Sequence, residues 1–141
     1  MSTLISEHLA TALREAGLRW TPAPGDRFVI PQPELEGQVF TLSEMTIEAH
    51  HYPSGTILGF NGTTEWALDA VAQEDALWLP REDQLRELLG ATFVSLERAG
   101  DAWVVVTREP DGLTVRHEAA TASDAYASAL LTLVQRATAP V

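Results

Sequence analysis

Apolar residues recur at helical spacing in three stretches of the chain. The first covers residues 4–16 and is followed by Gly17, a residue suited to a left-handed helix cap. The second covers residues 80–90, opened by a proline and closed by a glycine. The third covers residues 121–137, begins with hydroxyl residues suited to a cap, and carries one continuous apolar stripe. The pattern therefore predicts three helices.

Alternation of apolar and polar residues predicts strands in two groups. The first group precedes the second helix and covers 27–30, 38–52 with a bend near Ser43-Glu44, and 56–60. The second group lies between the second and third helices and covers 92–98, 102–109 and 113–119. Glycine-containing turns at 99–101 and 110–112 predict that the second group is a meander of hairpins.

Residues 63–72 fit two structures. Thr63 could cap a short helix that buries Trp66, or the segment could continue the first meander as a further strand. We favour the strand, because the Asn61-Gly62 pair that precedes it is a strong hairpin signal.

The element order predicts an α+β fold, written α-β(3-4)-α-β(3)-α. No linker-like segment divides the chain, and 141 residues is an ordinary length for one domain. We therefore expect a single domain over 1–141, with three helices on one shared antiparallel sheet of about six strands.

The residue inventory excludes several kinds of chemistry. The chain has no Cys, so it has no disulfide, thiolate metal site or cysteine nucleophile. All nine basic residues are Arg, so Schiff-base chemistry and a P-loop lysine are also excluded. No dinucleotide fingerprint, nucleophile elbow or His-Glu-x-x-His motif is present. We expect no cofactor and no bound metal.

The net charge of −11 bears on partners. Residues 1–80 carry eleven acids and three Arg, a net −8, whereas residues 81–141 carry nine acids and six Arg, a net −3. Residues 81–137 follow the α-β-β-β-α order of double-stranded-RNA-binding modules, but an acidic surface repels phosphate backbones. We expect no nucleic-acid partner. Any basic partner is expected on residues 1–80.

Nothing in the sequence indicates a membrane or an exported protein. No apolar run approaches the roughly 20 residues of a membrane span, and the N-terminus lacks the basic region of a signal peptide. Abundant Ala with Arg in place of Lys is typical of a GC-rich bacterial genome. We expect an acidic bacterial protein of the cytoplasm.

Glu48 and His50 form the sharpest candidate site for catalysis or metal binding. On a strand they share a face, roughly 6 to 7 Å apart by strand rise. A general base or a metal ligand could use this pair. The alternation of polar and apolar residues around it also describes any half-exposed strand. His117 could join the pair only through tertiary pairing.

Four tryptophans are many for a chain of this size: Trp20, Trp66, Trp78 and Trp103. They could line a ligand groove or a self-association face, and core packing is the alternative. Trp20 and Trp66 lie near expected loops, so these two are the candidates for surface contact.

Three segments carry a resemblance to a known family. They are 25–29 (GDRFV), 57–69 (ILGFNGTTEWALD) and 77–85 (LWLPREDQL), together with 17–20 (GLRW). The chain resembles small actinobacterial proteins of about this length, which are sometimes given a pilus-assembly label borrowed from a larger ATPase. An ATPase activity is not expected here, because the phosphate-binding loop and its lysine are missing.

Two functions remain. The first is a non-enzymatic protein that acts through protein–protein contact, with a protein partner or as a homodimer. The alternative is a small-ligand or metal-binding protein, or a hydrolase-like enzyme, built around Glu48 and His50.

Overall fold

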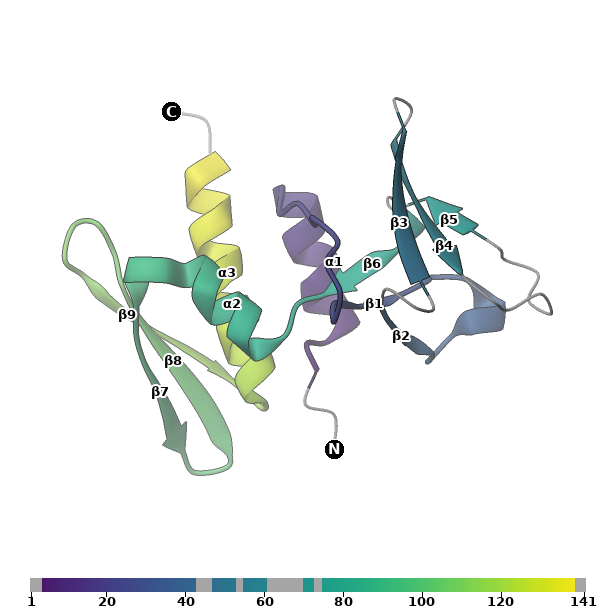
Figure 1. Cartoon of the computed structure of the whole chain (residues 1–141). Helices are drawn as coiled ribbons and strands as arrows, with labels where there is room; N and C mark the ends of the chain where they lie inside the picture. The colour runs from purple at the N-terminus through teal and green to yellow at the C-terminus, as the bar shows by residue number, and fades with distance from the viewer. Residues whose placement is uncertain (1–3, 43–46, 53–54, 61–69, 73–74, 139–141) are drawn as a thin grey trace. The chain divides into compact units, whose positions relative to one another are not determined.

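The computed structural model describes residues 4–42, 47–52, 55–60, 70–72 and 75–138 (Figure 1). The chain divides into two compact units. Met1–Arg19 and Pro80–Val141 form the first, here called the flanking unit, and Trp20–Leu79 form the second, here called the inserted unit. The broad α+β class predicted from the sequence is confirmed.

All three described α-helices belong to the flanking unit, near the positions predicted. They are α1 (Glu7–Ala16), α2 (Glu82–Leu89) and α3 (Ala122–Thr138). Local caps fix where they begin. The Ser6 hydroxyl accepts the Leu9 N–H at 3.3 Å, and the Thr121 hydroxyl accepts the Asp124 N–H at 3.1 Å. Gly17 ends α1 with a φ of 114°, a backbone conformation that favours glycine.

The sheet of the flanking unit also follows the prediction. Its strands are β7 (Phe93–Ala99), β8 (Ala102–Arg108) and β9 (Thr114–Ala119), paired antiparallel in the order β7-β8-β9. Gly100 and Gly112 take positive φ in the two connecting turns. The predicted meander is therefore confirmed.

Helix α3 is the centre of the flanking unit. It packs against α1, α2, β8 and β9 (Figure 1), and Tyr126, Ala127 and Leu130 are almost fully buried. Helix α1 runs parallel to α3, since hydrogen bonds join the two helices at both ends. Asp124 Oδ1 accepts the Ser6 N–H at 2.8 Å, and the Thr138 hydroxyl donates to the Ala16 carbonyl at 3.5 Å.

The inserted unit contains two small antiparallel sheets. One has the order β2-β1-β6. Its strands are β1 (Arg27–Val29), β2 (Val39–Thr41) and β6 (Leu77–Leu79), and the 3₁₀ turn η1 (Pro33–Leu35) precedes β2. The other has the order β3-β4-β5. Its strands are β3 (Ile47–Tyr52), β4 (Gly55–Phe60) and β5 (Ala70–Ala72).

Pairing of β1 with β6 explains how this unit is inserted. Arg27 lies opposite Leu79, so the first strand of the unit is joined to its last across about fifty residues of chain. The chain thus enters and leaves the unit at the same end of this sheet.

The prediction of one six-stranded sheet is wrong. The described strands form three separate three-stranded sheets, and six strands rather than three or four precede α2. Strands β7, β8 and β9 pair only with each other among the described residues, because short turns close them into a meander. In the ambiguous segment 63–72, the described part, Ala70–Ala72, is a strand paired with β4.

Candidate functional site

The sheet of the flanking unit has an inner face that packs on α3. Strand alternation and register place Phe93, Val105, Thr107 and His117 on this face. The ring of Phe93 lies 5.7 Å from that of Tyr126 on α3, and Val105 is fully buried. This face is therefore part of the core.

The outer face of the same sheet carries charged residues over a buried apolar strip. Val104 and Val106 of β8 are 1% and 5% exposed. Glu97 on β7 and Arg116 on β9 form an ion pair at 3.2 Å that reaches across β8. The hydrogen bond from the Ser95 hydroxyl has the largest effect on Glu97 and lowers the pKa of its carboxyl below the usual value. The interaction with Arg116 lowers this pKa further. The outer face is covered by its own side chains and offers no apolar surface along β8.

The two edges of this sheet differ. β7 has a register break between Phe93 and Ser95, and Val94 at that break is 46% exposed. A bulge of this kind twists an edge away from further pairing. β9 pairs with β8 over all six of its residues without a break. Its outward edge pairs with no other described strand. The β9 edge is thus a regular backbone surface open to another strand.

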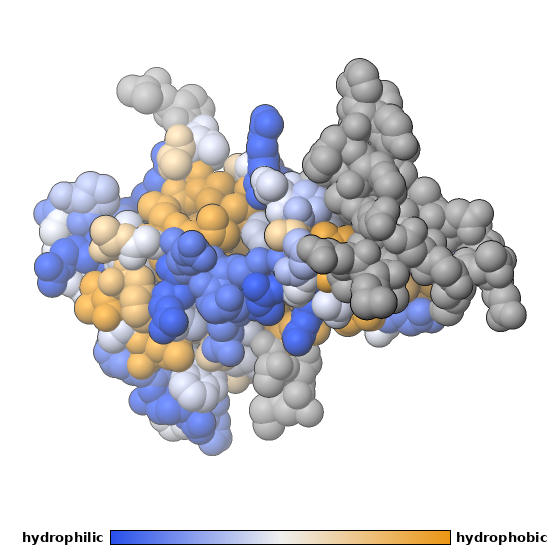
Figure 2. Space-filling model, in the orientation of Figure 1, coloured by the Kyte–Doolittle hydropathy of each residue, from blue (hydrophilic) through white to orange (hydrophobic). Residues whose placement is uncertain are grey.

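Exposed apolar side chains also occur in the flanking unit. Of the four large ones among the described residues, Leu88, Val94 and Leu113 belong to this unit, and Leu113 is 61% exposed. Leu113 lies just before β9. Orange areas stand among blue ones on the surface of this unit at the left of Figure 2.

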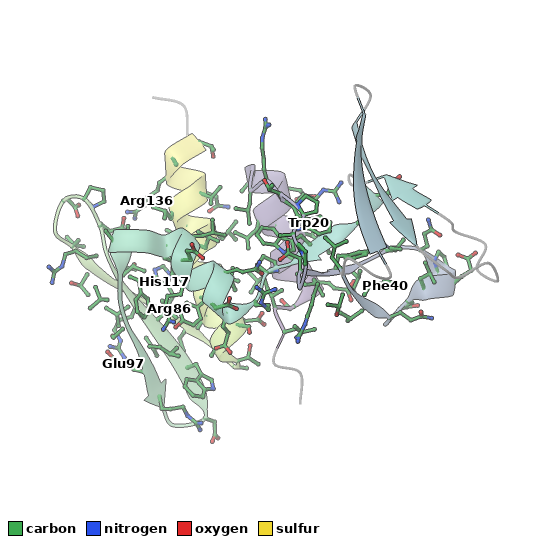
Figure 3. The ribbon with its side chains drawn as sticks, viewed as in Figure 1. Trp20, Phe40, Arg86, Glu97, His117 and Arg136 are labelled. Atoms are coloured by element: carbon green, nitrogen blue, oxygen red, sulfur yellow. The ribbon has the colours of Figure 1, made fainter. Side chains whose placement is uncertain are left out.

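A polar cluster joins the inner face to α3. The Thr107 hydroxyl lies 3.2 Å from His117 Nε2, and both residues are buried. Glu109, directly after β8, forms an ion pair with Arg136 of α3. Burial lowers the pKa of His117, Glu109 opposes that shift, and Arg136 adds to it. The imidazole is therefore neutral at pH 7, and Figure 3 shows His117 and Arg136 within this unit.

This cluster contributes to the packing of the sheet against α3. His117 and the Glu109 carboxylate are both largely buried, and Arg136 alone has a mostly exposed side chain. Sequence reasoning missed Thr107, Glu109 and Arg136. The alternation of β8, continued by one residue, places Thr107 and Glu109 on the same face, which was a usable signal. Arg136 gives no such signal because only tertiary packing brings α3 to the sheet.

Tyr126 forms a second buried polar contact, between α2 and α3. Burial raises its pKa, and the nearby Arg86, chiefly through its charge, acts in the opposite direction. The phenol is therefore protonated at pH 7 and ties the two helices together.

Trp20, one of the two tryptophans proposed for surface contact, is half-buried in the inserted unit. Its indole N–H donates to Asp26 Oδ2 at 2.9 Å, and the same oxygen accepts the Ala23 N–H at 3.0 Å. Asp26 is only 3% exposed. Trp20 stacks on Trp78 with ring centroids 6.3 Å apart, and lies 5.5 Å from Phe28. The buried Asp26 was missed from the sequence, because nothing local links it to Trp20 across a proline-rich loop.

Phe28 is at the centre of this aromatic cluster. It is fully buried on β1, opposite Phe40 on β2 and Trp78 on β6. The Phe28 and Phe40 rings are stacked at 5.5 Å, and Figure 3 shows Trp20 and Phe40 within the inserted unit. The indole N–H of Trp78 is buried without a hydrogen-bond partner among the described residues. The cluster is a packed core, and Trp78 supplies its one unsatisfied donor among the residues that the structure describes.

Glu48 and His50 lie on β3, opposite Gly59 and Ile57 of β4. Their side chains fall outside the described part of the structure, as does Trp66. His117 lies on β9 in the flanking unit, and among the described strands β9 and β3 belong to different sheets. Where side chains are described, no three His, Asp or Glu residues gather as a metal site.

Comparisons with protein-family models, curated proteins and solved structures found no match. The resemblance to small actinobacterial proteins stays a prediction. Within the described ranges, none of the helices has the length and apolar character needed to cross a bilayer.

Proposed function

We propose that this protein acts through protein–protein contact, either by self-association or by binding a protein partner, in the bacterial cytoplasm and without a catalytic role. The open edge of β9 supports this proposal most directly. Exposed edge strands recognise other chains through main-chain hydrogen bonds, and proteins that do not use such an edge tend to block it.

Two further features favour a protein partner. The exposed Leu113 adjoins the β9 edge, so an incoming chain would find an apolar contact beside the backbone donors and acceptors. The inserted unit carries nine acids and a single Arg, a net −8. That field repels nucleic-acid phosphates and attracts basic protein surfaces.

Native mass spectrometry of the protein as purified tests the proposal. We expect a dimer or a complex with a second protein, and no retained small molecule. A strictly monomeric protein that brings no partner and retains a small ligand or metal would overturn it.

The same measurement tests the alternative around Glu48 and His50. In that case His50→Ala would abolish retention of the ligand or metal while the far-UV circular dichroism stayed unchanged. Retention that is the same in both proteins would remove this pair from consideration.

A further inference from the structure

Self-association through β9 specifies a particular pairing. A two-fold axis perpendicular to the sheet would pair β9 antiparallel with its copy, so that one residue lies opposite itself. Only two centres, Arg116 and His117, pair five residues of the six-residue strand. Centres nearer either end of the strand pair fewer residues and give fewer main-chain hydrogen bonds.

Charge separates these two registers. Centring on Arg116 places two guanidinium groups directly opposite each other, which is destabilising. Centring on His117 places Arg116 opposite Glu118 of the second copy on both sides of the axis. On the other face, Val115 then lies opposite Ala119. Only the second register joins opposite charges.

Arg116 can pair with Glu97 of its own sheet and with Glu118 of the second copy at the same time. Its Nη1 donates to Glu97 at 3.2 Å, and a guanidinium carries five N–H donors in all. Glu118 is exposed, on the same outer face of the sheet as Arg116. The intermolecular pair therefore forms without breaking the ion pair that covers β8.

From this edge, its register and its charges, we infer that two copies of this chain associate through β9 with His117 at the two-fold axis, forming one continuous six-stranded antiparallel sheet in the order β7-β8-β9-β9-β8-β7. The inference rests on the proposed function and names the partner as a second copy. β7 is the outer strand at each end, where its bulge opposes further growth of the sheet.

Charge reversal in β9 tests this register. Dimer dissociation constants are measured by sedimentation equilibrium at low salt for Arg116→Glu, Glu118→Arg and the double variant. Each single change places like charges opposite each other twice, and we expect the dimer dissociation constant to rise about tenfold. The double variant restores opposite charges, and we expect its dissociation constant within about threefold of the unaltered protein.

Arg98→Glu on β7 controls for net charge, because it changes the net charge as Arg116→Glu does, on the other edge of the same sheet. Arg98 lies over the Trp103 ring, on the opposite face of the sheet from Arg116. We expect no change in the dimer dissociation constant. A dimer weakened by Arg98→Glu and insensitive to both β9 changes would place the contact on β7 and overturn the inference.

A cross-linking measurement tests the register through the distance between two introduced thiols, so it does not depend on comparing the dissociation constants of charge variants. Because the chain has no cysteine, Arg116→Cys and Glu118→Cys each introduce the only thiol. Under mild oxidation, a mixture of the two variants should form a disulfide-linked dimer faster than either alone. Equal rates in all three samples would overturn the register.

The outcomes separate the two proposals. A dimer whose dissociation constant is unchanged by every β9 substitution overturns this inference but agrees with the proposed self-association. A monomer overturns this inference, and the proposed function then depends on whether a different protein co-purifies.

Discussion

The two units are stabilised in different ways. The flanking unit has a central helix buried against two other helices and a sheet, so its stability comes chiefly from aliphatic packing. The inserted unit has strands of only three residues in its β2-β1-β6 sheet, and its core combines buried aliphatic side chains with an aromatic cluster tied to the buried Asp26. We infer that substitutions that create cavities destabilise the flanking unit most. Substitutions that remove hydrogen bonds destabilise the inserted unit most.

Charge sharpens this contrast. The inserted unit has a net charge of −8 with one Arg, whereas the flanking unit has eleven acids balanced by eight Arg, a net −3. Like charges at this density repel each other and oppose compaction. The acidity that the sequence analysis assigned to residues 1–80 therefore belongs to the inserted unit, and α1 belongs with the C-terminal part of the chain.

Two spectroscopic signals separate the units. All described α-helices are in the flanking unit, so far-UV circular dichroism at the helix band reports chiefly on it. Three of the four tryptophans belong to the inserted unit, so tryptophan fluorescence reports chiefly on that unit.

The largest expected effect is a cavity in the flanking unit. Leu85 and Leu88 both lie on α2, but Leu85 is fully buried and Leu88 is 42% exposed. Leu85→Ala should lower the free energy of unfolding by about 2–5 kcal/mol, and Leu88→Ala by less than about 1 kcal/mol. Urea titration followed by circular dichroism measures both. Equal losses would show that α2 is not packed as described.

An intermediate effect is expected from the indole groups of the inserted unit. Trp20→Phe removes a donor to buried Asp26 and should cost about 1–3 kcal/mol, because a buried acceptor loses a partner. Trp78→Phe removes a donor that has no partner among the described residues, so it should cost less. Urea titration followed by the remaining tryptophan fluorescence compares the two. A larger loss for Trp78→Phe would contradict the assigned roles of the two indoles.

The sequence predicted the flanking unit better than the inserted one. Helices α1 and α3 have strong apolar periodicity with local caps at Ser6 and Thr121, and the β7–β9 turns contain glycines, so short-range signals were sufficient. Pairing of β1 with β6 joins segments about fifty residues apart, and three-residue strands carry little alternation. No local pattern could separate those strands from one common sheet.

The same reasoning applies to the candidate sites. The alternation of apolar and polar residues predicted the β9 strand and the positions of its charges. It could not predict the unpaired edge, which depends on which strands share a sheet. Trp20 was predicted as a candidate for surface contact, and its bond to Asp26 could not be predicted because it depends on a loop that brings the two residues together. The histidine that the structure places in a buried network is His117, whose partners come from β8 and α3.

The smallest expected effect is a pH dependence confined to the flanking unit. Burial, with the Arg136 charge, holds the folded-state pKa of His117 below its unfolded value near 6.5, despite the opposing Glu109 charge. The unfolded state then binds more protons below that pH, so the contribution of neutral His117 is present above about pH 6.5 and is lost as pH falls through 6.5 toward the folded-state pKa.

His117→Gln provides the comparison, because glutamine does not titrate and can still hydrogen-bond Thr107. Urea titrations followed by circular dichroism between about pH 5 and pH 8 should show a steeper loss of stability on acidification for the unaltered protein than for the variant. The fluorescence signal of the inserted unit should respond equally in both. Identical circular dichroism profiles would mean that His117 titrates alike in the folded and unfolded chain, and that its burial against α3 does not set the acid response of this unit.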